Sequence, residues 1–235
     1  MKGPKAAGLF VLLLFAAGCL GGEYRPTENN LPERDGKIIE LPAPARDGLV
    51  SVEEALNQRE STREFRDRVL ESDELAQILW AASGDVYDGT TGATRVAPSA
   101  GATHPMEVYL VAGRVEGVEK GVYDYRREDH TLQQIKKGDY REELAGMALG
   151  QQAIVEAPAS MVLVAYYGRT TDRYGERGER YVHMEAGHMA QNVSLQVEAL
   201  NLSTVIIGAF DDNEVASLLG EEGAPMLIMP LGRGK

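Results

Sequence analysis

The chain has 235 residues, of which 43% are hydrophobic, enough to bury the core of one folded domain with a short additional segment. Its 36 acidic and 24 basic residues give a formal net charge of −12 at pH 7, which disfavours nucleic acid as a partner. The single cysteine excludes an intramolecular disulfide.

Residues 1–19 are typical of an export signal. Lys2 and Lys5 give a positive start, residues 6–15 are apolar, and Ala-Ala-Gly-Cys supplies a small-residue cleavage site that ends at Cys19. The apolar run is too short to span a bilayer comfortably. The segment resembles a lipobox, with alanine where leucine is usual, and predicts a lipoprotein exported and anchored to the cell membrane. An ordinary secretory signal and an uncleaved anchor are the alternatives.

Residues 20–48 are rich in Gly, Asn and Pro and predict a tether, in which only residues 37–41 could form a short strand. The folded domain is expected over residues 49–235.

Two helices are expected at the start of this domain. The first begins at Ser51, whose hydroxyl can accept a hydrogen bond from the Glu54 amide in a capping box, and ends near Arg59. The second begins near Ser72, carries an apolar stripe at helical spacing and can end at Gly84.

Residues 85–105 lack a hydrophobic period, and a long irregular stretch in a compact domain is often functional. Beyond it, strands are expected at 108–112, 121–125, 131–135, 161–166, 204–209 and 226–231, and helices at 140–151, 179–201 and 212–219, the last capped by Asp211 and ended by Gly220. Hairpins mixed with helices predict the α+β class.

Hydrogen-bond donors cluster just after the first expected helix. Arg59 and Arg63 are permanently charged and lie four residues apart, with Ser61 between them, a set that suits a phosphate monoester. The same arginines could instead complement the helix dipole or pair with neighbouring acidic side chains. Spacing alone favours this second interpretation.

The stretch from Arg59 to Phe65 resembles the Arg-Arg-Ser-x-Arg-x-Phe signature that opens nitroreductase-family domains, with Glu60 in place of the second arginine. The resemblance implies that Arg59, Ser61 and Arg63 hold the phosphate and ribityl chain of FMN.

The segment at 97–105 is similar to the Pro-Ser-Ala-Gly segment of the same family. The resemblance implies that Pro98, Ser99, Ala100 and Gly101 approach the isoalloxazine ring, usually that of the partner subunit. Small residues suit this role, because only backbone and short side chains can approach a flat ring closely. An ordinary surface turn is the alternative.

The later chain resembles SagB-type dehydrogenases, so the resemblance covers about residues 38–235. The matching segments are 121–125, 174–181 and 185–192. The cofactor contacts it implies here are Glu185, Gly187, Ile207, Gly208, Ala209 and, near the C-terminus, Arg233. Backbone amides at 185–187 and 207–209 are expected to favour the charge of the reduced ring.

SagB-type enzymes that aromatise azolines carry a Lys-Tyr pair for proton transfer, whereas this chain has Arg173 and Tyr174. Arginine stays charged because of its very high pKa and cannot easily act as a base, so proton transfer weakens or moves to Tyr174 and azoline oxidation is less favoured. Tyr174 as an ordinary loop aromatic is the alternative. No metal site is expected, because Glu185 and His188 lack a second Glu-x-x-His pair and His183 and His188 diverge around a helix.

Together, these features predict an α+β, nitroreductase-like fold with a largely antiparallel sheet flanked by helices and FMN at a homodimer interface. The expected reaction transfers a hydride between flavin N5 and a small-molecule or peptide substrate. Because nicotinamide nucleotides are cytosolic, an exported enzyme needs another electron partner, and the direction of the reaction is open. The alternative is an exported solute-binding or scaffold lipoprotein that kept the fold and lost the flavin.

Overall fold

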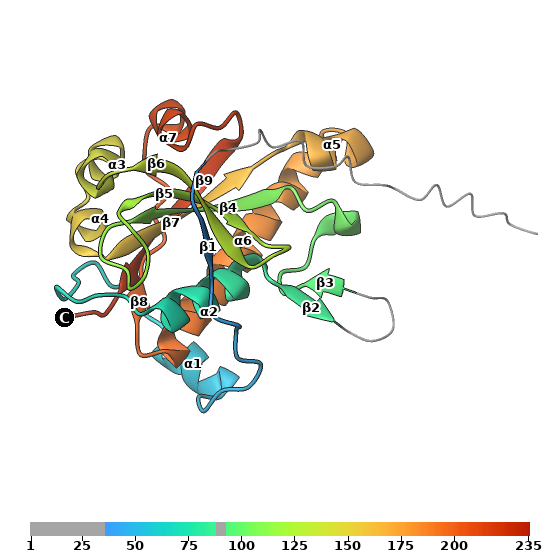
Figure 1. Ribbon diagram of the computed structural model, residues 1–235. Coiled ribbons are helices and arrows are strands. Elements are labelled where there is room, and N and C mark those ends of the chain that lie inside the picture. The colour runs from blue at the N-terminus through green and yellow to red at the C-terminus, as the bar shows by residue number, and fades with distance from the viewer. Residues whose placement is uncertain (1–35, 88–92) are drawn as a thin grey trace, which may run out of the picture. The chain divides into compact units, whose positions relative to one another are not determined.

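The structure, a computed structural model, describes residues 36–87 and 93–235 and is built around a seven-stranded sheet (Figure 1). The strands lie in the order β1-β6-β5-β4-β7-β9-β8, and each neighbouring pair is antiparallel. Their bounds are β1 Ile38–Glu40, β4 Met106–Ala112, β5 Gly121–Arg126, β6 Thr131–Lys137, β7 Ala159–Ala165, β8 Ser203–Thr204 and β9 Ala224–Gly232. A separate hairpin joins β2, Asp85–Tyr87, to β3, Ala93–Arg95.

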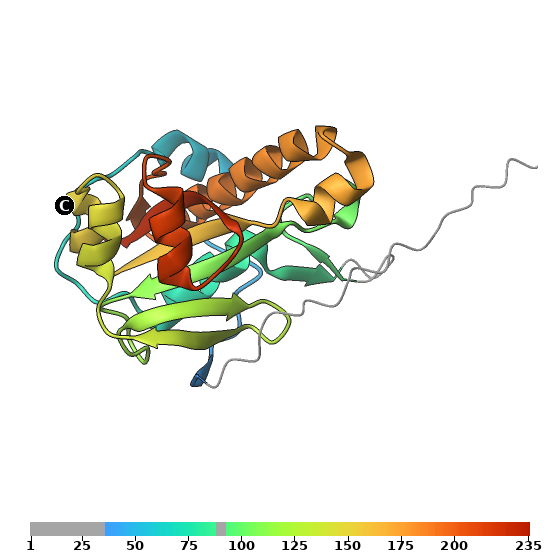
Figure 2. The same ribbon diagram turned by 90° about the horizontal axis from the view of Figure 1, so that it is seen from above.

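Helices cover both faces of the large sheet (Figure 2). Their bounds are α1 Val52–Gln58, α2 Ser72–Ser83, α3 Arg141–Met147, α4 Gln152–Glu156, α5 Gly168–Tyr174, α6 Arg177–Ala199 and α7 Asp212–Leu219, with a short 3₁₀ turn, η1, at Ala100–Ala102. The expected α+β class and largely antiparallel sheet are confirmed.

The central strand β4 shows how the two layers of the core form. Successive side chains of a strand point to opposite faces. Val108 and Leu110 belong to a buried cluster that includes apolar residues of α2 and α6, whereas Tyr109 and Val111 belong to a cluster with those of α3, α4 and α7. The continuous apolar run of β4 therefore fills both cores at once.

The caps of the first two helices follow the sequence closely. The Ser51 hydroxyl accepts a hydrogen bond from the Glu54 amide at 3.1 Å, while the Glu54 carboxylate accepts one from Gln58 instead of closing the box. The Gly84 amide donates to the Trp80 carbonyl at 2.7 Å and ends α2 as expected.

Two expected elements are corrected. The helix expected over 140–151 ends at Met147, because Leu149 and Gly150 adopt left-handed φ angles of 57° and 73°, and α4 then starts separately. The strand expected over 204–209 is reduced to β8, after which Ile207 makes only an isolated bridge to Ile228. Helix α5 was not expected, since residues 168–174 carry no apolar stripe.

The expected signal segment at 1–19 lies outside the described residues. The short strand expected within 37–41 is confirmed as β1, which pairs with β6 at the edge of the sheet. In the described part of the chain, no helix combines the length and apolar character needed to cross a membrane.

Candidate functional site

The segment that follows α1 displays the expected phosphate donors at the surface. Thr62 donates its amide hydrogen to the Thr204 carbonyl at 3.0 Å, and buried Phe65 bridges to Gly234, so both ends of the segment are fixed to the sheet. The side chains of Arg59 and Ser61, just before Thr62, and of Arg63, between Thr62 and Phe65, are exposed. Two guanidinium groups and a hydroxyl are thus open to a ligand from solvent.

Acidic side chains lie close to these donors. The Glu60 amide donates to Glu198 Oε1 at 3.3 Å. Burial raises the pKa of the Glu198 carboxyl, and the nearby charge of Arg59 acts in the opposite direction. An anionic ligand at Arg59 would therefore meet competition from Glu198.

Arg233 is already paired in this structure. Its Nη2 atom donates to Glu74 Oε1 at 2.7 Å, and its Nη1 atom donates to the Asn201 carbonyl at 3.1 Å. Both side chains of the ion pair are mostly buried. The phosphate contact expected of Arg233 stays a prediction. A bound phosphate would have to share the Arg233 guanidinium with Glu74, through which the C-terminal segment is linked to α2.

The second expected half of the site is the segment 98–104, which turns sharply around η1. Gly101, Ala102 and His104 have φ angles of 58°, 54° and 47°, a conformation costly for the two residues with side chains. The Ser99 hydroxyl accepts a hydrogen bond from the His104 amide at 2.9 Å and closes the turn.

Helix α5 holds this turn from one side. Arg173 Nη1 donates to the Gly101 carbonyl at 2.8 Å, and a Cβ added to Gly101 would lie 2.3 Å from the Tyr174 hydroxyl. The hydroxyls of Thr103 and Thr170 are 2.8 Å apart. The structure therefore brings together Gly101, Arg173 and Tyr174, which the sequence assigned separately.

Buried charges lie beside the segment 98–104. Glu185 is 3% exposed, and burial raises the pKa of its carboxyl to about 7, against the opposing effects of a hydrogen bond from Ser99 and the charges of Arg95 and Arg169. Burial, aided by Arg95, lowers the pKa of His104 to about 4.

Arg169 ties this cluster to the sheet. It donates to Glu107 Oε1 at 2.5 Å and to the His104 carbonyl at 3.0 Å. Sequence reasoning assigned no role to Arg95, Glu107 and Arg169. Arg95 and Glu107 stand out as single charges within otherwise small or apolar segments, whereas Arg169 lies in a segment with other charges and carries no such signal.

The expected role of backbone amides needs a correction. Glu185 and Gly187 lie inside α6, where amide groups are used by the helix itself, so they cannot donate to a bound ring. The Ile207 amide is likewise bonded to the Ile228 carbonyl at 2.9 Å. Gly208 and Ala209 are exposed and follow this bridge, so their amides are the ones that fit the expected role.

The two halves of the expected site lie in different parts of the chain. The cyan segment after α1 passes β8 and the C-terminus, whereas the turn before β4 lies beside α5 (Figures 1 and 2). One chain does not bring residues 59–63 to residues 98–101.

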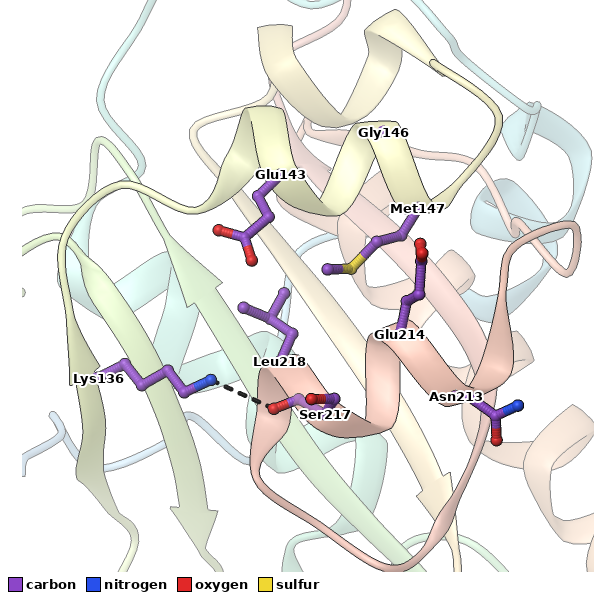
Figure 3. A pocket seen from close by; sticks show the side chains of 8 residues that line it. All are labelled: Lys136, Glu143, Gly146, Met147, Asn213, Glu214, Ser217 and Leu218. Carbon is purple, nitrogen blue, oxygen red and sulfur yellow. Dashed lines mark hydrogen bonds between the residues drawn. The ribbon is translucent and has the colours of Figure 1, made fainter.

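A surface cleft of about 550 Å³ lies elsewhere, between β6, α3 and α7 (Figure 3). Lys136, Glu143, Met147, Glu214 and Leu218 are among its lining residues, and Lys136 Nζ donates to the Ser217 carbonyl at 3.2 Å. It contains none of the expected site residues. Within residues 36–87 and 93–235, no three side chains of His, Cys, Asp or Glu are grouped to hold a metal ion.

The sequence model of the nitroreductase family matches residues 56–233 of this chain. The match includes the segment from Arg59 to Arg63 and the turn at 98–101. The chain belongs to the nitroreductase family. It is therefore an oxidoreductase by family, and the observed sheet is that of a nitroreductase-like fold.

Individual relatives of this nitroreductase-family chain agree with that assignment. A protein of Methanocaldococcus jannaschii, named as a nitroreductase, is 46% identical over 184 residues, covering 78% of this chain and 91% of that protein. A solved nitroreductase structure from Anabaena variabilis superposes with a TM-score of 0.73 at 30% identity, covering 85% of this chain and 42% of that one. The trifolitoxin-processing protein TfxB of Rhizobium leguminosarum bv. trifolii is 32% identical over 120 residues, covering 46% of this chain and 30% of that protein.

Proposed function

We propose that the protein is an FMN-dependent oxidoreductase of the SagB type, which transfers a hydride between flavin N5 and a small-molecule or peptide substrate. The observation that carries the proposal is the exposed set of Arg59, Ser61 and Arg63 on a segment fixed to the sheet of a nitroreductase-family chain.

This donor set fits the phosphate end of FMN. Two guanidinium groups can each donate paired hydrogen bonds to phosphate oxygens, and the Ser61 hydroxyl adds a further donor. The chain as a whole carries a formal charge of −12, so a dianion needs such a local positive site to bind. Glu60 and Glu198 reduce the positive charge of that site but leave its hydrogen-bond donors in place.

The arrangement supports a homodimer. Residues 59–63 and 98–101 lie apart within one chain, so a second copy placed across the flavin would unite a phosphate site from one subunit with a ring-facing turn from the other (Figure 1). Symmetric pairing of two identical surfaces is the commonest form of soluble oligomer.

When bound, FMN supplies the two-electron chemistry at its ring. The residues of this chain bind and shape the site. The exposed Pro98 and Gly101 would present only small groups to a flat ring, while Arg173 holds the Gly101 carbonyl. The Tyr174 hydroxyl, close to Gly101, is the group placed to hold or move a proton.

A peptide substrate is supported by the similarity to the trifolitoxin-processing protein. The expected lipidation of Cys19 adds export and anchoring to the cell membrane, with a membrane-associated electron partner in place of a nicotinamide nucleotide. Substrate class and anchoring are parts of the proposal that rest on resemblance and on residues 1–19.

The visible spectrum of the purified full chain tests the proposal. A yellow protein that releases FMN on denaturation, together with a dimeric mass in sedimentation, is the expected result. A colourless protein that takes up no FMN on titration would contradict the oxidoreductase proposal. It would then favour a solute-binding or scaffold lipoprotein that kept the fold, and a co-purifying solute or peptide would support that outcome.

A further inference from the structure

Glu185 is a buried carboxyl that the flavin chemistry proposed above does not use. It projects from α6 and is 3% exposed. Ser99, its hydrogen-bond partner, belongs to the segment 98–104, and Arg95 on β3 and Arg169 on α5 are the charged groups that act on it. A carboxyl placed in this way links the turn to three secondary-structure elements.

The Ser99 hydroxyl accepts one hydrogen bond and can donate another. The Ser99 hydroxyl accepts from the His104 amide at 2.9 Å, so its own proton is available for the Glu185 carboxyl. The link holds down a turn in which Ala102 and His104 are kept at positive φ angles. Strain of this kind persists only where surrounding contacts impose it.

We propose that Glu185 is a positioning residue: it anchors the segment 98–104 through Ser99, and gain or loss of its proton sets how tightly that segment docks. The docking itself is a property of the chain, whereas its consequence for a bound flavin rests on the proposed function.

The direction of the effect follows from burial. Burial raises the pKa of Glu185 from its ordinary 4.5 to about 7, because desolvation outweighs the hydrogen bond from Ser99 and the charges of Arg95 and Arg169. Opening of the segment 98–104 would admit water to this carboxyl and return its pKa toward 4.5. A raised pKa means that the docked state prefers the protonated acid. Docking is therefore tightest below about pH 4.5 and weakens as the pH rises through about 7.

Nearby groups do not account for a transition near neutral pH. The pKa of His104 is lowered to about 4, so its ring is neutral above pH 5. Arg169 is paired with Glu107, and burial lowers the pKa of Arg95 from its ordinary high value. A change in docking between pH 5 and pH 7 that disappears with the Glu185 carboxyl therefore reports on that group.

Hydrogen exchange of the full chain as purified tests the inference. The opening constant of amides 99–104, corrected for the intrinsic pH dependence of exchange, is expected to rise roughly tenfold per pH unit between about pH 5 and pH 7 and then to level off. Glu185→Gln should abolish this slope. Glu179→Gln, which changes an exposed carboxyl on the same helix, should keep it.

A pH-independent opening in the wild-type chain, or an equal slope in Glu185→Gln, would overturn the inference. If Glu185→Gln fails to fold, Ser99→Ala provides the second variant: because the Ser99 bond lowers the pKa of Glu185, its loss should move the end of the slope to higher pH. If the slope in Ser99→Ala ended at the same pH as in the wild type, the inference would also be overturned.

The same samples separate this inference from the proposed function. A chain that binds no FMN but shows the slope would contradict only the flavin proposal. A flavin-loaded dimer with pH-independent exchange in the turn would contradict only the role of Glu185.

Discussion

The guanidinium of Arg173 donates from Nη1 to the carbonyl oxygen of Gly101 at 2.8 Å, and this bond joins α5 to the turn at η1. A guanidinium is permanently charged and makes a poor base, but it holds a carbonyl well. Arg173 stands where azoline-oxidising SagB-type enzymes carry a lysine, and it is suited to fixing the turn rather than to taking up a proton.

Replacing Gly101 with alanine should destabilise the fold. The new Cβ would meet the Tyr174 hydroxyl at 2.3 Å and would sit at a φ of 58°, so we expect a loss of about 1–3 kcal/mol in the free energy of unfolding. Denaturant titration measures it. Gly146→Ala in α3, where an added Cβ meets nothing within 4 Å, should be neutral or slightly stabilising. If Gly101→Ala and Gly146→Ala were equally stable, the predicted clash between the new Cβ at position 101 and the Tyr174 hydroxyl would be wrong.

Removal of both arginines from the donor set should weaken FMN binding through its phosphate. Each charge-assisted hydrogen bond contributes about 1.5–3 kcal/mol, so Arg59→Ala with Arg63→Ala should raise the Kd for FMN roughly 10²–10⁴-fold. Binding of riboflavin, which lacks the phosphate, should change far less. The matched control is Arg66→Ala with Arg68→Ala, which removes two exposed arginines nearby. If the double variant prefers FMN over riboflavin as strongly as the wild type does, the assignment of Arg59 and Arg63 to the phosphate is wrong.

The pair of Arg233 and Glu74 should contribute to stability whether or not FMN binds. Arg233→Ala leaves the mostly buried Glu74 carboxylate without its 2.7 Å partner, and we expect about 1–3 kcal/mol of destabilisation in flavin-free protein. Thermal or denaturant unfolding measures this loss. A variant of unchanged stability but weaker FMN binding would instead assign Arg233 to the phosphate.

Asp139 should govern part of the acid stability. Hydrogen bonds from Arg141 hold the pKa of its carboxyl well below the usual value, so its contribution is present above about pH 4 and is lost as the pH falls further. Asp139→Asn should lower the free energy of unfolding at pH 7 by roughly 1–3 kcal/mol and flatten its acid dependence. Asp67→Asn is the control, since that paired carboxylate is 89% exposed. Parallel acid curves for wild type and Asp139→Asn would refute the assignment.

Much of the fold was predictable because its signals are local. Apolar runs and alternation located strands β4, β5, β6, β7 and β9 and helices α2 and α6, and the hydroxyl of Ser51 and the carboxylate of Asp211 marked two helix starts. The errors arose where conformation depended on single residues. Leu149 at positive φ interrupts a helical pattern, and Ile206 to Ala209 continue an apolar run without pairing as a strand.

The sequence by itself determined the family and the α+β class, because these depend on residue types at short spacings, and it predicted the donor residues at 59–63. Only the tertiary structure decided that Arg173 and Glu185 both act on the turn at 98–104, and that Arg233 is bound to Glu74. The reason is physical. Burial, which sets the pKa of Glu185, and the pairing of charges between β3, β4, α5 and α6 arise when segments distant in sequence pack together, and no local pattern encodes them.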